Sequence, residues 1–383
     1  MAAFTLEDRL EIRNDLIAGK VPKRMPIYVN FQLDAAVGLA GVDPVKVHYE
    51  PELMEKAYAK LCDTFFADAM PVVNMRFAPA YQALGSTNWV MGSTGSMQHP
   101  EVASMQPEEY EAYTANPYEY MMETLMPRLC SALDTDPVNR SINLAKGYAA
   151  YNRAVAEQGA VIGKLVQKHG YGPGIITGTM WTAPFDFVAD QLRGFKGITM
   201  DIRRCPSKVK AAVEASVPLL MKQATLARNK PGCYTFIPLH LAPFINMKQF
   251  EELFWPTFQK MIWDLHEMGI YCCLFAEEDW TRFADHLAGL PKSSIILCEY
   301  GDPVVFKEKV AKDRPVGGFF DPTMTLVKSK EDCLDEVKRL CDILGPGGNA
   351  YFRWNKGIID IKSINVDKLQ AVLEWVRDNT DYR

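Results

Sequence analysis

Short apolar runs alternate with amphipathic segments along most of this chain. Eight of the runs are rich in Val, Ile, Phe and Tyr, and this composition predicts strands. They cover residues 26–31, 69–75, 174–179, 234–240, 271–277, 294–300, 315–321 and 349–355. Most of them are continuously apolar, which is typical of parallel strands that are covered on both faces.

Helical periodicity fills the segments between these runs. Apolar residues recur at helical spacing over 51–66, 207–228, 247–268, 303–312, 329–344 and 366–378. Eight strands that alternate with helices predict an α/β fold, a (β/α)8 TIM barrel, with a doubly wound sheet as the competitor. We predict a single domain over 1–383, with an N-terminal helical extension (1–25) and a helical insertion after the second strand (76–173).

Composition and charge narrow the class of protein. The formal net charge of −5 and the lack of a basic run argue against a nucleic-acid partner. No apolar stretch reaches 18 residues, so we expect no membrane span, and the charged N-terminus is unlike a signal peptide. Nine cysteines without a C-x-x-C pair are typical of reduced thiols. These features predict a cytoplasmic protein.

Polar residues stand where the predicted strands end. In α/β barrels this carboxyl edge carries the functional groups, although any chain turns polar where a strand ends. The residues at these ends are Asn30, Asn74, Arg76, Thr179, Trp181, His240, Glu277, Glu299, Asp321, Arg353, Asn355 and Lys356.

Three of these residues form a candidate metal site. His240, Glu277 and Glu299 end consecutive strands, and zinc accepts imidazole nitrogen and carboxylate oxygen, usually from three protein ligands. Cys298 is the alternative to Glu299, because strand alternation lets only one of the two point inward. The competing interpretation of His240 is a hydrogen-bonded structural histidine.

The same edge has a metal-free interpretation. Glu277, Asp321 and Lys356 are then candidates for acid–base catalysis. Arg76, Arg353 and Lys356 could hold a carboxylate-bearing substrate, the arginines by bidentate contacts, or they could form ordinary ion pairs with Asp321 or a glutamate. The candidate substrate-binding residues are Asn30, Arg76, Trp181, Arg353 and Asn355.

Three passages carry a resemblance to a known family. They are GIITGTMWTAPFDFVADQLRGFKGITMDIRRCPSKV (174–209), INMKQFEELFWPTFQKMI (245–262) and the region from PVGGFFDPTM to RWNKGI (315–358). The chain resembles the uroporphyrinogen decarboxylase-like superfamily, in its corrinoid-dependent methyltransferase branch, from about residue 50 to its end. The resemblance implies a (β/α)8 barrel and methyl transfer to a Co(I) corrinoid held by a separate protein.

The departures from the family pattern limit this implication. VNFQLDAAVG (29–38) replaces the family's propionate-binding run, Arg76 replaces its aspartate, and Asp190 lies near its tyrosine position. These changes argue against porphyrinogen decarboxylation. The zinc-binding His-x-Cys of the thiol methyltransferases falls on Phe275-Ala276-Glu277, and their late cysteine falls near Asn355 or Lys356.

We therefore expect demethylation of a methoxylated compound, an aromatic one being an option, with zinc assisting and a corrinoid protein taking the methyl group. A metal-free decarboxylase or lyase acting on a small carboxylated substrate is the first alternative. A non-catalytic ligand- or corrinoid-binding protein is the second. The sequence leaves the methyl donor and the oligomeric state open.

Overall fold

The computed structural model describes residues 4–227 and 234–380. Residues 1–3, 228–233 and 381–383 of the predicted domain therefore lie outside the described residues. Residue 228, the end of the predicted 207–228 helix, is one of them.

A six-stranded parallel sheet forms the centre of the molecule. Its order is β10-β9-β8-β7-β6-β5, so strands that follow each other in the chain are neighbours in space. Its members are β5 (Ile176–Met180), β6 (Tyr234–Leu239), β7 (Tyr271–Asp279), β8 (Ile295–Tyr300), β9 (Val316–Gly318) and β10 (Ala350–Tyr351). The predicted α/β class is confirmed.

The two earliest predicted strands pair separately, as β1 (Phe31–Gln32) with β2 (Val72–Val73), also in parallel. Among the described residues the eight strands do not form one closed ladder. Isolated parallel bridges join the two sheets instead, Ile27 to Phe352 at one seam and Ala69 to Gly172 at the other. Prolines 26, 71 and 173 stand beside these bridges. Because proline has no N–H to donate, ladders are interrupted where it occurs.

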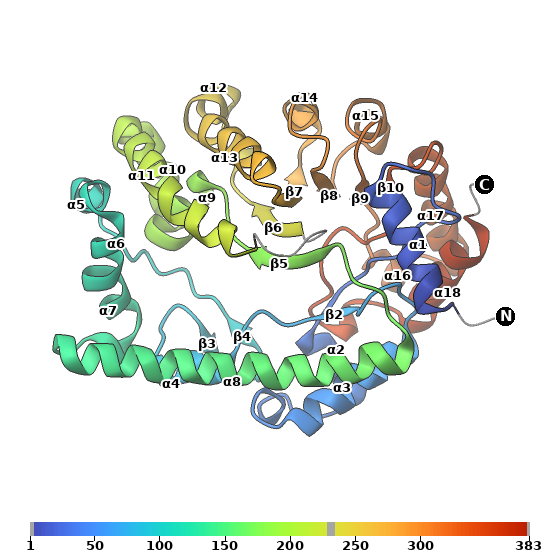
Figure 1. The fold of residues 1–383 in the computed structure, drawn as a ribbon, viewed down its shortest axis with the longest axis horizontal. Helices are drawn as coiled ribbons and strands as arrows, with labels where there is room; N and C mark the ends of the chain where they lie inside the picture. The colour runs from blue at the N-terminus through green and yellow to red at the C-terminus, as the bar shows by residue number, and fades with distance from the viewer. Residues whose placement is uncertain (1–3, 228–233, 381–383) are drawn as a thin grey trace.

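Helices surround this framework. Figure 1 shows α10 to α15 along one side of the six-stranded sheet and the long α8 crossing the opposite side of the molecule. Those that follow the six-stranded sheet are α9 (Pro184–Phe187), α10 (Gly194–Arg204), α11 (Pro206–Ala224), α12 (Met247–Gln249), α13 (Trp255–Glu267), α14 (Ala284–Ala288), α15 (Pro303–Lys309), α16 (Met324–Val327), α17 (Lys330–Leu344) and α18 (Val366–Asn379). Within the described residues, the bounds of each predicted helix differ from observed helical bounds by four residues or fewer, and the predicted 247–268 helix corresponds to α12, a π-helical turn (Phe250–Phe254) and α13.

The segments predicted as extension and insertion are also helical. The first contains α1 (Leu6–Ile17), and α2 (Leu33–Ala40) and α3 (Pro51–Thr64) follow it. Residues 76–173 contain α4 (Ala78–Leu84), the hairpin β3 (Val90–Met91) and β4 (Met97–Gln98), α5 (Tyr110–Ala115), α6 (Pro117–Tyr120), α7 (Met126–Leu129) and α8 (Pro137–His169). Asp136 caps α8 by accepting from the N–H groups of Val138 and Asn139, and Gly170 ends it in the left-handed conformation.

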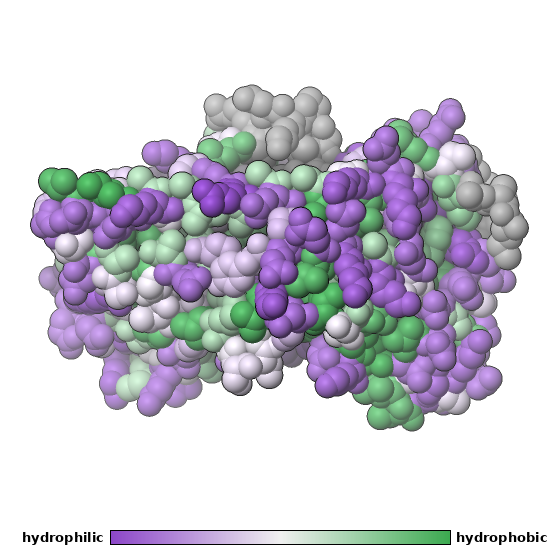
Figure 2. Space-filling view, turned by 90° about the horizontal axis from the view of Figure 1, so that it is seen from below, coloured by the Kyte–Doolittle hydropathy of each residue, from purple (hydrophilic) through white to green (hydrophobic). Residues whose placement is uncertain are grey.

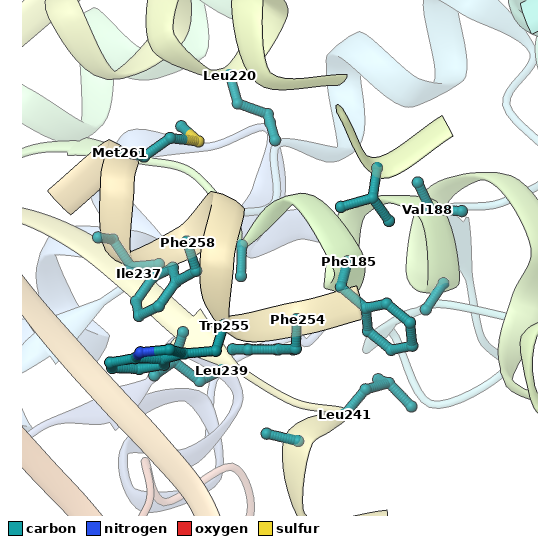
Figure 3. Close-up of a cluster of buried hydrophobic side chains, with 14 of the residues drawn as sticks. Phe185, Val188, Leu220, Ile237, Leu239, Leu241, Phe254, Trp255, Phe258 and Met261 are labelled. Atoms are coloured by element: carbon teal, nitrogen blue, oxygen red, sulfur yellow. The ribbon is translucent and has the colours of Figure 1, made fainter. Parts of the chain in front are cut away.

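The two faces of the sheet carry different side chains. Ile237 and Leu239 of β6 pack toward the helices, against Phe254 and Phe258 (Figure 3). Tyr234, Cys273, Ile295 and Tyr351 belong to a separate cluster on the opposite, interior face. This alternation decides which strand-end residues can meet inside.

The outer surface of α8 is mixed in character. Figure 2, which views the molecule from the side of α8, shows hydrophilic and hydrophobic residues interspersed over this face. None of the helices in the described part of the chain combines the length and apolar character that crossing a bilayer requires.

Candidate active site

His240 lies between two carboxylates at the carboxyl end of the sheet. Leu239 of β6 is in register with Ala276 of β7, which brings the next residues, His240 and Glu277, side by side. The Nε2 atom of His240 lies 3.2 Å from Oε1 of Glu277, and its Nδ1 atom lies 2.6 Å from Oδ2 of Asp190. Burial lowers the pKa of His240, but the hydrogen bonds to Asp190 and Glu277 outweigh it and raise that pKa to about 11. The ring is therefore a doubly protonated imidazolium at neutral pH.

Asp186 fixes the backbone that presents this imidazole. It is completely buried, and its carboxylate accepts hydrogen bonds from the N–H groups of His240 (2.9 Å) and Leu241 (3.0 Å). Burial raises the pKa of Asp186 to about 7. Asp186 and Asp190 are four residues apart on the helical turn after β5, so both point toward the end of β6. Phe185 and Val188 anchor the same turn in the hydrophobic core (Figure 3).

A second ion pair lies at the ends of β8 and β10. Oε1 of Glu299 is 2.7 Å from Nζ of Lys356, and Oε2 accepts from the N–H of Glu278 at 2.9 Å. Glu278 adopts φ 61°, in the left-handed region, where the register of β7 against β8 shifts. The hydrogen bond to Glu299 raises the pKa of Lys356. Each carboxylate oxygen of Glu299 thus already has a hydrogen-bond partner within the protein.

Cys298 points away from this edge. Its side chain is fully buried in the core between sheet and helices, whereas Glu299 belongs to the opposite face. Of the two alternative ligands, the structure therefore places Glu299 on the interior side.

The interior face of β6 and β7 is accessible to solvent beneath His240. Phe236, Pro238 and His240 are half-buried while the residues between them are buried, and Phe275 and Glu277 follow the same alternation. The rings of Phe236 and Phe275 stack with centroids 6.2 Å apart. A flat apolar group can therefore rest on this face, close to the imidazolium.

Other predicted site residues have buried polar atoms without partners. Within the part of the chain that is described, these include Oδ1 of Asn30, Nε1 of Trp181, Nε of Arg353 and Nδ2 of Asn355. Buried polar groups are normally paired, so each is an available contact for a ligand or water. Asp321 differs, because Thr323 donates to it from both its N–H and its hydroxyl, which makes it a turn residue before α16.

Arg76 joins an aromatic stack in the predicted insertion. Its guanidinium carbon lies 4.6 Å from the ring centre of Trp89, and Trp89 stacks on His99 with centroids 4.3 Å apart. Burial lowers the pKa of His99, while Asp190 raises it and Arg76 lowers it, so this stack reaches the neighbourhood of Asp190.

The three predicted zinc ligands do not share one point. The described residues contain no group of three His, Cys, Asp or Glu side chains placed to hold a metal ion. His240 and Glu277 are neighbours, but both oxygens of Glu299 are engaged by Lys356 and the Glu278 N–H. The arrangement does not fit the three-ligand zinc site expected from the sequence.

Sequence reasoning paired His240 with Glu277 but missed its contacts with Asp186 and Asp190. Asp186 and Asp190 carried a visible signal, two carboxylates at i and i+4 in the apolar turn PFDFVADQL. His99 carried none, because only the folded hairpin brings it near Asp190.

Comparison with known proteins supports the architecture. No protein-family model matches the chain, and no curated protein matches its sequence. Among solved structures, a methyltransferase from Methanosarcina mazei aligns with a TM-score of 0.58, covering 97% of this chain and 98% of that chain. At 15% sequence identity this likeness shows a shared fold.

Proposed function

We propose that this protein is a methyltransferase that takes a methyl group from a methoxylated compound and passes it to a corrinoid carried by a separate protein. The observation that carries the proposal is the position of His240, whose two ring nitrogens face Asp190 and Glu277 at the carboxyl end of the sheet. The fold shared with a solved methyltransferase over nearly the whole chain supports it. The bridges at both seams also support a variant of the (β/α)8 barrel, and the free cysteines of the described residues fit the predicted cytoplasmic location.

His240 supplies the proton that this reaction requires. When the methyl–oxygen bond breaks, the methyl group goes to the reduced corrinoid and the bonding electron pair stays on the oxygen. That oxygen then accepts a proton from Nε2 of His240. Glu277 holds this proton in the resting site, and Asp190 orients the ring from its other side. A positioned general acid typically accelerates such a step by about 10²–10⁴-fold.

Zinc assistance is implied by the family resemblance alone. His240 and Glu277 are two candidate ligands, and the described residues contain no group of three His, Cys, Asp or Glu side chains placed to hold a metal ion. No step of the proposed reaction depends on a metal ion.

Single-turnover methyl transfer tests the proposal. The wild-type protein is mixed with a set of methoxybenzenes and with free cobalamin reduced to Co(I), and methylcobalamin formation is followed by absorbance. We expect transfer by the wild type and a loss of about 100-fold or more in His240→Ala. Transfer at the wild-type rate in a folded His240→Ala variant would refute the assigned role.

A metal-free decarboxylase is the second candidate function. It is favoured by Arg353, which forms no ion pair with a carboxylate of the described residues and is free to bind a carboxylated substrate. This candidate predicts release of carbon dioxide without any corrinoid.

A further inference from the structure

Arg353 is an uncompensated cation on the interior face of the sheet. Tyr351 belongs to the interior cluster, whereas Phe352 and Trp354 belong to the core beneath the helices, so alternation turns Arg353 inward. Its Nη1 donates to the backbone oxygen of Tyr28 at 3.2 Å, and its Nε is buried without a partner. No carboxylate in residues 4–227 or 234–380 forms an ion pair with it.

The groups around Arg353 cannot neutralise it. Burial raises the pKa of Cys273 to about 12 and raises the pKa of Tyr28 and of Tyr351 well above their ordinary values. All three are therefore uncharged at neutral pH. Burial also lowers the pKa of Arg353 itself, which reflects the cost of holding a cation there without an anion.

Asn355 adds a second donor on the same face. It stands two residues beyond Arg353 and is completely buried. Its Oδ1 accepts from the N–H of Lys356, which leaves Nδ2 without a partner. Arg353 as a whole is only partly buried, and Phe236 and Phe275 on the interior face of β6 and β7 are also partly exposed, so this face of the sheet is open to a ligand.

We propose that Arg353 and Asn355 form a receptor for a carboxylate on the substrate, which makes the preferred methyl donor a methoxylated acid with a flat apolar body. The planar guanidinium matches the two oxygens of a carboxylate, and Lys356 is unsuited to this role because Glu299 already neutralises it. This inference rests on the proposed function and adds the substrate class to it.

Calorimetric titration without corrinoid tests the receptor. The probes are 3-methoxybenzoate and its neutral analogue 3-methoxybenzamide, titrated into the wild type, Arg353→Gln and Arg353→Lys. Arg339→Gln is the matched control, because Arg339 is a surface arginine paired with Glu336 on α17. We expect the acid to bind the wild type and the control equally, and Arg353→Gln to bind it roughly 10- to 100-fold more weakly. Arg353→Lys keeps the charge but loses the planar fork, so its affinity should lie between the two.

The melting temperature of each variant is measured first, so that only folded proteins are compared. If Arg353→Gln does not fold, Asn355→Ala replaces it. We expect this variant to bind 3-methoxybenzoate roughly 3- to 10-fold more weakly and to bind 3-methoxybenzamide as the wild type does. Equal binding of acid and amide by the wild type, or full affinity in the folded variants, would overturn the receptor.

The outcomes for the two proposals are separable. A wild type that binds the acid through Arg353 but transfers no methyl group would keep the receptor and refute the methyltransferase. A wild type that demethylates acid and amide equally well would keep the methyltransferase and refute the receptor.

Discussion

The exchange of Asp190 for Asn should lower the pKa of His240 while preserving the shape of the site. The 2.6 Å contact between Nδ1 of His240 and Oδ2 of Asp190 loses its negative charge. A hydrogen bond between charged groups contributes about 1.5–3 kcal/mol. The two side chains are 34% and 24% exposed, so solvent screening favours the lower end of this range. At 1.36 kcal/mol per pKa unit, the pKa of His240 should fall by about one unit.

Stability should follow the same titration. The pKa of His240 in the folded protein, about 11, lies above its ordinary value of 6.5. The stabilisation by the imidazolium is therefore complete below pH 6.5 and is lost as the pH rises toward 11. At pH 6 the Asp190→Asn variant should have a free energy of unfolding lower by about 1.5 kcal/mol.

NMR titration of the six histidine rings measures the pKa directly, with His240→Gln identifying the signal. Asp285→Asn is the matched control, since Asp285 pairs with Lys309 on the surface. The wild-type His240 ring should stay protonated through pH 9. A wild-type midpoint near the ordinary value, or an unchanged midpoint in Asp190→Asn, would refute the reasoning.

Three further predictions concern the buried Arg24–Asp68 ion pair, the Glu299–Lys356 ion pair and the metal. Arg24→Met should lower the free energy of unfolding in urea by about 3 kcal/mol, because it removes two charged hydrogen bonds to the buried carboxylate of Asp68 and leaves it only Arg9 at 3.9 Å and the N–H of Ile27, and a loss below about 1 kcal/mol would contradict this. Lys356→Met should cost about 1–2 kcal/mol by removing the partner of Glu299, and the Lys356→Arg variant should recover most of it. Elemental analysis after dialysis should find less than one zinc per chain, because only His240 and Glu277 meet; one zinc that is lost in Glu277→Gln would favour the metal route.

The strands were predictable because burial on both faces makes them continuously apolar. Whether the strands close into one continuous barrel was not predictable, because the effect of Pro26, Pro71 and Pro173 depends on the register at each seam. β1 and β2 are accordingly much shorter than the apolar runs that predicted them.

The candidate site was predictable as a set of strand ends but not as a set of pairs. His240 and Glu277 meet because β6 and β7 are in register, as the strand order suggested. Glu299 pairs with Lys356 instead, across 57 residues of sequence, and a bulge in β7 lets the Glu278 N–H take its other oxygen. Such pairings between residues far apart in the sequence depend on loop conformation, which the sequence pattern does not specify.

The most direct test of the account is methyl transfer from 3-methoxybenzoate to Co(I) cobalamin, measured for the wild type and His240→Ala after both are shown to be folded. The account predicts methylcobalamin formation by the wild type and a rate at least about 100-fold lower in the variant. No methylcobalamin from the folded wild type with any methoxylated compound tested, or equal rates for the two proteins, would contradict it.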